Sequence, residues 1–201
     1  MNIWKDLATE INGKFVEGIA WRSDRTEVNY KNFILVFDNF TLWSGKYSQE
    51  FTRVRFAYNS DQNFVFKIYR NGIVGTVEKI FGAQDVKIGF DEFDKAFIIK
   101  SNDDYKIFEL LKSESLRNLI EALDVVNLEV SSNVGIREEK LPENEYELCY
   151  YSDTTINDIE KLKGIYELFQ AMINRLLDIK AIKAKAEPLT AHKRNLGISE
   201  G

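Results

Sequence analysis

Six carboxylate residues surround one apolar segment near the middle of the chain and are the first candidates for chemistry. They lie between Asp91 and Leu111, in DEFDKAFIIKSNDDYKIFELL, with Asp91, Glu92 and Asp94 before AFIIKS and Asp103, Asp104 and Glu109 after it. A glycoside hydrolase needs two carboxyl groups about 5–9 Å apart. A strand the length of AFIIKS spans roughly 20 Å, which places the flanking groups at its opposite ends. We therefore interpret these aspartates as turn and helix-cap residues.

Metal binding has little support in the residue types. The chain contains one cysteine and one histidine, Cys149 and His192, whereas a zinc site needs several such ligands close together. Two stretches offer oxygen ligands for calcium, Asn59–Asn63 (NSDQN) and Phe90–Lys95 (FDEFDK), but neither follows the pattern of a calcium-binding loop. We predict no metal site and no cofactor.

Nucleophilic catalysis and nucleotide binding are not indicated either. His192 lies in the C-terminal tail, so no histidine in the body of the chain is available to activate a serine or a cysteine. A Ser-Lys pair remains open, although no spacing supports one. Cys149 lies within YELCYYS, where we interpret it as a core residue of a strand. The chain has neither a P-loop nor a G-x-G-x-x-G motif. We predict no catalytic or cofactor-binding residue and favour a non-enzymatic protein.

The charge of the chain disfavours nucleic acid as a partner. The net charge is −5, which repels phosphate backbones on average. Four basic residues, Arg53, Arg55, Lys67 and Arg70, could line one sheet face beside aromatic residues, as in an RNA-binding sheet. Because acidic residues nearly match basic ones, we favour cross-strand ion pairs on a solvated face.

The composition predicts a cytoplasmic protein. A single cysteine allows no disulfide within the chain, which suits a reducing compartment. The N-terminus lacks the apolar run of a secretory signal, and no stretch approaches the roughly 18 apolar residues of a membrane-spanning helix.

Two hydrophobic periodicities alternate along the chain and predict an α+β fold. Apolar residues of Ile3–Ile11 form one helical stripe, whereas period two dominates from Lys14 to about Ile99. Asn102, Asp103 or Asp104 can cap a central helix, and a second helix follows a break near Lys112-Ser113. The expected strands are FVEGIAW, NFILVF, FTRVRFAY, NFVFKIY, DVKIGF, KAFIIKS, VVNLEVSS and YELCYYS, with a hairpin turn at Asn71-Gly72.

These elements predict a single α+β domain over residues 1–180, followed by a weakly structured tail over 181–201. A curved antiparallel sheet, built as a meander, is covered by an N-terminal helix, a central helix pair and a long C-terminal helix. The expected core comprises Phe33, Leu35, Phe56, Phe66, Ile68, Phe97, Ile99, Leu110, Leu119, Tyr166, Phe169 and Ile173.

The C-terminal helix, expected to begin at Thr154 or Thr155, carries apolar residues spaced three and four apart. They are Ile159, Leu162, Tyr166, Phe169, Ile173 and Leu176. This spacing matches a coiled-coil seam, so a homodimer through these residues is one interpretation. Further apolar residues widen the stripe, and we therefore favour packing of the helix over the sheet.

The segment from about residue 85 to 150 resembles an uncharacterised bacterial domain family of unknown function. The matching positions are Phe93 and Phe97, Ser101, Asp103, Leu110 and Leu111, and Leu116 to Leu119. Many members of that family carry two transmembrane helices before the domain, and this chain has no such segment. The resemblance implies no activity and no catalytic residue.

The leading functional hypothesis is a soluble, non-catalytic module that binds a partner protein or a small ligand. One alternative is a lipid or apolar-ligand binder with a β-lined cavity, because 14 phenylalanines could line such a cavity. The other is a carboxylate-based hydrolase with a divalent metal.

Overall fold

The computed structural model describes residues 2–19, 23–44, 46–71, 84–132 and 141–184. Within these ranges, nine strands form one open antiparallel sheet in the order β1-β2-β3-β4-β9-β8-β5-β7-β6. The strands are β1 (Lys14–Val16), β2 (Arg25–Tyr30), β3 (Phe33–Ser44), β4 (Tyr47–Asn59), β5 (Phe66–Arg70), β6 (Gln84–Val86), β7 (Phe97–Ser101), β8 (Asn127–Ser132) and β9 (Glu145–Tyr151).

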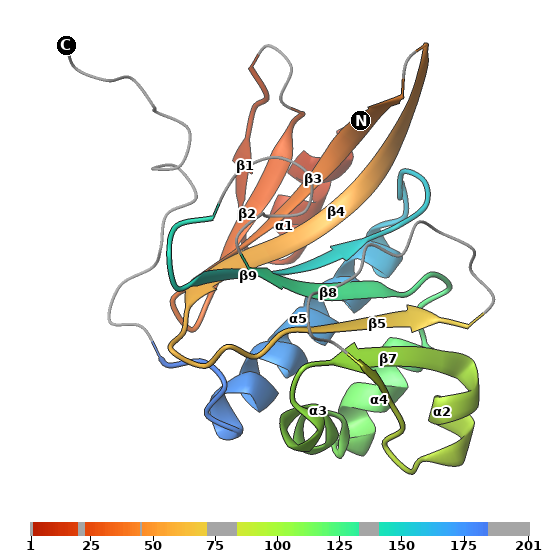
Figure 1. Cartoon of the computed structure of the whole chain (residues 1–201). Helices are drawn as coiled ribbons and strands as arrows, with labels where there is room; N and C mark the ends of the chain where they lie inside the picture. Colours follow the sequence, from red (N-terminus) through yellow and green to blue (C-terminus); the bar gives the residue numbers. More distant parts are fainter. Residues whose placement is uncertain (1, 20–22, 45, 72–83, 133–140, 185–201) are drawn as a thin grey trace.

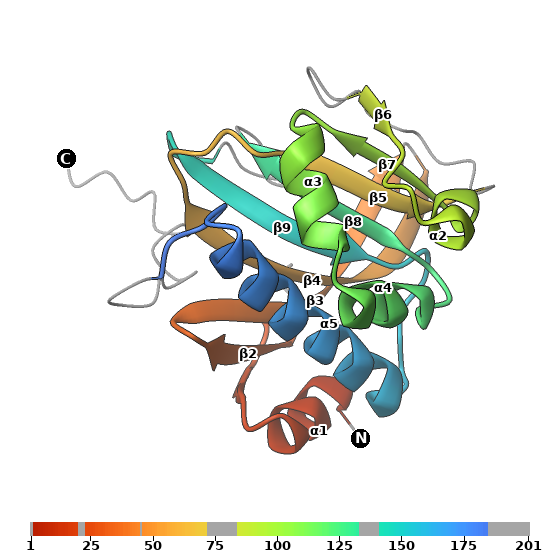
Figure 2. The ribbon, with the colours of Figure 1, turned by 90° about the horizontal axis from the view of Figure 1, so that it is seen from below.

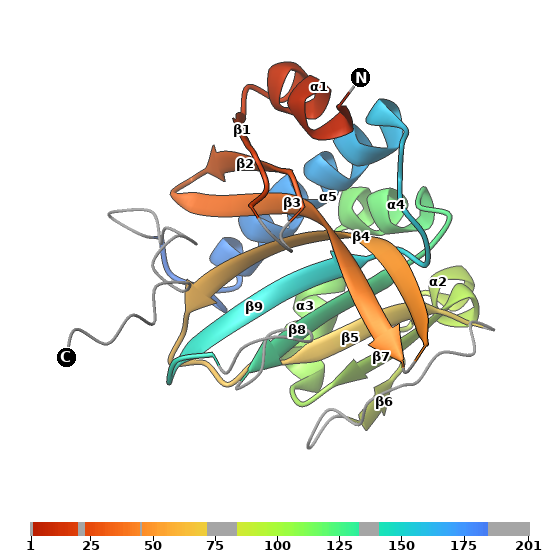
Figure 3. The same ribbon diagram turned by 90° about the horizontal axis from the view of Figure 1, so that it is seen from above.

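The helices of the described ranges all lie on one face of the sheet (Figures 2 and 3). They are α1 (Ile3–Glu10), α2 (Asp91–Ala96), α3 (Asp104–Leu111), α4 (Glu114–Glu121) and α5 (Ile159–Asp178). The predicted α+β fold is therefore confirmed, including the antiparallel sheet and the long C-terminal helix. We call the opposite side of the sheet the helix-free face.

The strand connections differ from the prediction at two places. The first four strands are a meander, but β5 pairs with β7 and β8 instead of β4. The prediction also missed β2, which a tight turn at Lys31 and Asn32 joins to β3. Both turn residues have positive φ, 51° and 65°, as a type I′ hairpin turn requires. Gly72 of the expected Asn71-Gly72 hairpin lies outside the described residues.

Several predicted boundaries were wrong. Only Val86 and Asp85 of DVKIGF belong to a strand, and the following residues Asp91–Ala96 form the short helix α2. The last helix is capped by Asp158, which accepts hydrogen bonds from the backbone N–H groups of Glu160 and Lys161. Asp158 precedes the first apolar residue of the stripe, so the predicted start was a few residues early.

The core fills the space between the sheet and the helices. The ring of Phe56 on β4 packs edge-to-face against two other rings. Its centroid lies 6.1 Å from that of Phe169 on α5 and 5.5 Å from that of Phe33 on β3. All predicted core residues are buried except Leu119 and Tyr166, which are partly exposed. The fully buried phenylalanines thus pack against one another and against α5.

The seam of α5 faces its own sheet, as the favoured interpretation required. Its central residues Leu162, Phe169, Ile173 and Leu176 are 0% exposed. A homodimer through this seam would have to remove these side chains from the core.

The first residues of the expected tail are packed against the body. Ala181 and Ile182 are buried, and Ser60 Oγ donates a hydrogen bond to the carbonyl oxygen of Ala181 at 2.9 Å. Lys183 forms an ion pair with Asp61 at 2.6 Å. Residues 185–201 lie outside the described part of the chain.

Candidate functional site: the β3–β4 arm and the ion cluster at its root

The aspartates Asp94 and Asp103, which flank strand β7, accept hydrogen bonds from backbone N–H groups at the ends of helices and strands. Asp94 accepts hydrogen bonds from the N–H groups of Ile88 at 3.1 Å and Gly89 at 2.9 Å. Asp103 caps α3 by accepting from the N–H of Lys106 at 2.9 Å. Strand β7 separates the two acidic groups. Within the described ranges, no group of three or more His, Cys, Asp or Glu residues is arranged to hold a metal ion.

Cys149 is buried in β9 and behaves as a core residue. Burial raises the pKa of its thiol well above the usual value, and the nearby Glu147 carboxylate acts in the same direction. The thiol is therefore protonated at neutral pH, whereas a nucleophilic cysteine needs its thiolate form.

The long hairpin of β3 and β4 extends past the strands that flank it. The two strands pair continuously from Val36 opposite Arg55 to Ser44 opposite Tyr47. However, β2 pairs with β3 only as far as Asp38, and β9 pairs with β4 only from Arg53 onward. Residues 39–44 and 47–52 therefore form a two-stranded ribbon at the upper right of Figure 1. We call this ribbon the arm.

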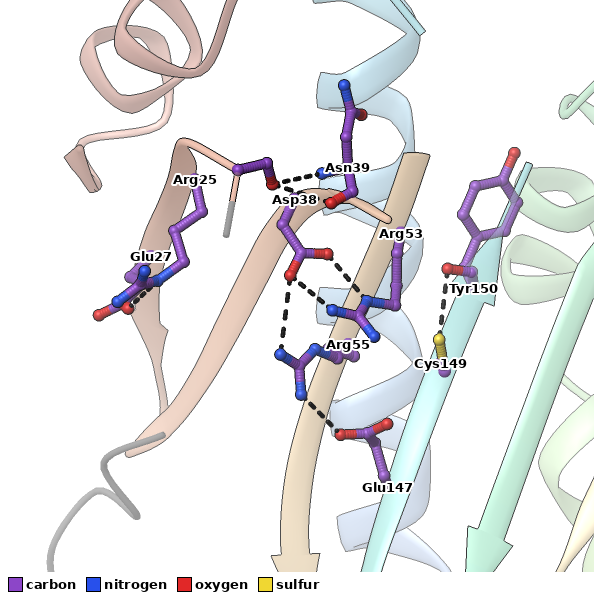
Figure 4. Close-up of polar contacts among 10 residues, drawn as sticks. Arg25, Glu27, Asp38, Asn39, Arg53, Arg55, Glu147, Cys149 and Tyr150 are labelled. Atoms are coloured by element: carbon purple, nitrogen blue, oxygen red, sulfur yellow. Dashed lines mark hydrogen bonds and ion pairs between the residues drawn. The ribbon is translucent and has the colours of Figure 1, made fainter. Parts of the chain in front are cut away.

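Four charged residues on the helix-free face meet where the arm leaves the sheet (Figure 4). Arg53 donates to Asp38 through Nε at 2.8 Å and Nη2 at 2.7 Å, a bidentate pair between opposite residues of β4 and β3. Arg55 Nη2 lies 3.6 Å from the same carboxylate, and its Nη1 donates to Glu147 Oε2 on β9 at 3.1 Å. These residues, which we call the ion cluster, connect three adjacent strands.

The ion cluster is largely removed from water and balances its own charge. Asp38, Arg53 and Glu147 are 6%, 5% and 3% exposed. Burial alone would lower the pKa of Arg53, but the Asp38 carboxylate outweighs it, and the pKa lies above the usual value. The pKa of Arg55 is also raised, because Glu147 and Asp38 outweigh burial and the repulsion from Arg53. Two guanidinium groups face two carboxylates, so the cluster offers no excess charge to a ligand.

Neighbouring segments hold the root of the arm from both sides. On the β4 side, the N–H of Ser152 donates to the carbonyl oxygen of Thr52 at 3.0 Å, and the N–H of Ile156 donates to Thr52 Oγ1 at 2.8 Å. On the β3 side, Ser23 Oγ bonds both backbone groups of Asn39, at 2.8 and 3.2 Å. The arm is therefore anchored by polar contacts on both of its edges as well as by the ion cluster.

The basic face considered for RNA is occupied by ion pairs. Arg53 and Arg55 bind carboxylates in the ion cluster, and Lys67 lies 3.0 Å from Glu129 on β8. Arg70 lies on the other face and donates to a backbone carbonyl after α4. Cross-strand pairing was predicted correctly, but the cluster is buried instead of solvated. The cluster has no local sequence signature, because the two arginines of β4 meet carboxylates from two other strands, β3 and β9.

Beyond its root, the arm has one edge without a neighbouring strand among the described residues. Backbone N–H and C=O groups of alternate residues point to opposite edges of a strand. The N–H and C=O of Asn39 both point away from β4, toward Ser23. The N–H and C=O groups of Thr41 and Trp43, two and four residues later, therefore point to the same edge of β3. On the other strand, Gln49 Nε2 donates to the carbonyl oxygen of Asp153 at 2.7 Å. The β3 edge of the arm is therefore the more open of the two.

Comparisons with known proteins establish similarity of fold only. No protein-family model matches the chain, and no curated protein matches it in sequence. The crystal structure of the mycobacterial trehalose monomycolate transport factor A, TtfA, has a similar fold, with a TM-score of 0.51 and 9% sequence identity. The match covers 91% of this chain and 96% of that one. Among the described helices of this chain, none is long and apolar enough to cross a membrane.

Proposed function

We propose that this chain is a non-catalytic interaction module that presents the β3–β4 arm to a partner protein. The observation that carries the proposal is the contrast between the root and the edge of the arm. The root is held by a buried, self-neutralised ion cluster. The β3 edge beyond it has no strand neighbour within the described ranges. A two-stranded ribbon alone is only marginally stable in water, so an added strand would stabilise the arm.

The arm suits recognition by strand addition. In this mode an extended segment of a partner joins an open sheet edge, and backbone hydrogen bonds supply the affinity. Thr41 and Trp43 direct backbone groups to the open edge, as the contacts of Asn39 imply. The anchored root fixes the direction of the ribbon. Less conformational entropy is therefore lost when a partner binds.

Site-specific photocrosslinking tests the proposal. A photoreactive amino acid at Leu42, in cells that express the chain, is expected to give a defined protein adduct that mass spectrometry identifies. The matched control carries the same amino acid at the exposed Glu167 on α5 and is expected to give no such adduct. Absence of an adduct at residue 42, or the same adducts from both positions, would contradict the proposal.

Lipid or apolar-ligand binding is a second candidate function. It is supported by the similarity of fold to a protein named as a transport factor for trehalose monomycolate. The fully buried phenylalanines of this chain pack against other core residues, so a lipid would need a site other than the one expected from the sequence. A native mass spectrum of the gently purified protein distinguishes the bare chain from a chain that carries a ligand.

A further inference from the structure

We propose that the strand added to the β3 edge of the arm comes from a second copy of this chain. This inference rests on the proposed function, because it names the partner of the same edge. Residues 40–44 of the two copies would pair antiparallel about a two-fold axis. The product is a symmetric dimer in which two arms form a continuous four-stranded ribbon.

The sequence of this edge lacks the features that normally prevent strand addition. Exposed edges are usually protected by charged residues, proline, bulges or very short strands. Residues 40–44 read FTLWS, with no charge, no proline and no glycine, and with mostly strand-favouring residue types. The outer strands β1 and β6 are only three residues long and contain Lys14 and Asp85. The β4 strand of the arm carries Glu50. Protection is therefore missing at the β3 edge in particular.

A two-fold axis at Leu42 matches the backbone groups of this edge. Thr41 of one copy would lie opposite Trp43 of the other, and each residue directs both backbone groups to the open edge. These two pairings use the outward backbone groups of both residues. Leu42 would lie opposite Leu42 of the second copy in a non-hydrogen-bonded pair. No charged residue lies within the paired segment, so like charges do not meet across the axis.

The chemistry of the edge favours a protein strand over a lipid bilayer. Hydrocarbon offers no hydrogen-bond partner to unpaired backbone N–H and C=O groups, so an open ribbon is strongly disfavoured there. A second copy supplies an equally uncharged edge of matching length, which satisfies the backbone groups of both chains at once.

Disulfide crosslinking tests the register of the pairing. Residues opposite each other in a non-hydrogen-bonded antiparallel pair have Cα atoms about 4.5 Å apart, within the range that a disulfide bridges. The Leu42→Cys variant is expected to form a covalent dimer under mild oxidation. The wild type, whose only cysteine is the buried Cys149, and the Glu50→Cys variant on β4 are expected to remain uncrosslinked.

Light scattering over a range of concentrations provides the second measurement. The wild type and the Glu50→Lys variant are expected to form dimers. The Leu42→Lys variant, which sets two like charges opposite each other, is expected to be monomeric with an unchanged circular dichroism spectrum. A monomeric wild type, or a dimer that Leu42→Lys leaves intact and Leu42→Cys does not crosslink, would overturn the inference. An adduct with a different protein at residue 42 would then still support the proposed function, whereas no adduct would reject both.

Discussion

The Phe169→Ala variant is expected to lower the free energy of unfolding by about 3–5 kcal/mol. Phe169 is 0% exposed and lies at the centre of the α5 stripe that covers the sheet. The centroid of its ring lies 6.1 Å from that of Phe56 on β4. Alanine therefore removes a contact between the helix layer and the sheet and leaves a cavity. Equilibrium unfolding in urea, followed by circular dichroism, measures the change.

The neighbouring Glu167 supplies a control on the same helix. Its side chain is exposed, and a Glu167→Ala variant is expected to change the free energy of unfolding by no more than about 0.5 kcal/mol. Truncation of a buried phenylalanine normally costs several kcal/mol. If Phe169→Ala lowers the free energy of unfolding by less than about 1 kcal/mol, α5 does not pack on the sheet as described.

Breaking the ion cluster should have a comparable effect. The Arg53→Met variant keeps the length of the side chain but leaves the buried Asp38 carboxylate with only the longer 3.6 Å contact to Arg55. Removing one partner of a buried pair typically costs about 3–5 kcal/mol, because the remaining charge is desolvated without compensation. The free energy of unfolding of Arg53→Met is expected to fall by this amount.

A double variant separates the ion pair from simple packing. Removing both charges with Asp38→Leu and Arg53→Met leaves no uncompensated Asp38 carboxylate, so most of the lost stability is expected to return. The exposed pair of Glu92 and Lys95 is the matched control, and Lys95→Met is expected to leave the unfolding curve unchanged. If Arg53→Met unfolds like the wild type, the cluster does not hold the root of the arm.

Local sequence patterns were sufficient to predict the layers of the fold. The alternation of Val54, Phe56 and Tyr58 identified the buried face of β4, and all three residues pack toward the helices. One of Asn102, Asp103 and Asp104 was expected to cap the central helix, and Asp103 does so. These features depend on residues only a few positions apart, which is the range over which periodicity and capping rules apply.

The candidate site could not be predicted because it depends on pairing between distant segments. Asp38 meets Arg53 only through the register of β3 and β4, and Glu147 comes from a strand 92 residues after Arg55. The arm was also missed, because FTLWS and the facing residues 47–52 do not alternate strictly between apolar and polar types. Alternation of apolar and polar residues identifies a strand with one buried face, and it does not identify a ribbon that extends beyond the sheet.

The ion cluster lies at the place where the arm leaves the sheet. Asp38 and Arg53 lie in the last row in which β2, β3, β4 and β9 are all paired, directly before the arm begins. The bidentate hydrogen bonds between Arg53 and Asp38 require these two residues to lie opposite each other, so they favour the observed register of β3 and β4. The cluster therefore sets the position from which the uncharged edge of β3 is presented.

Amide hydrogen exchange at the arm tests the central claim most directly. Isotope-labelled protein is compared in dilute buffer and in concentrated extract of cells that express the chain. The amides of Thr41 and Trp43 are expected to exchange more slowly in the extract, because an added strand would bond them. The amide of Leu42 points toward β4 and is expected to exchange at the same rate in both conditions. Equal, fast exchange of Thr41 and Trp43 in both conditions would show that no strand binds this edge, and would contradict the account.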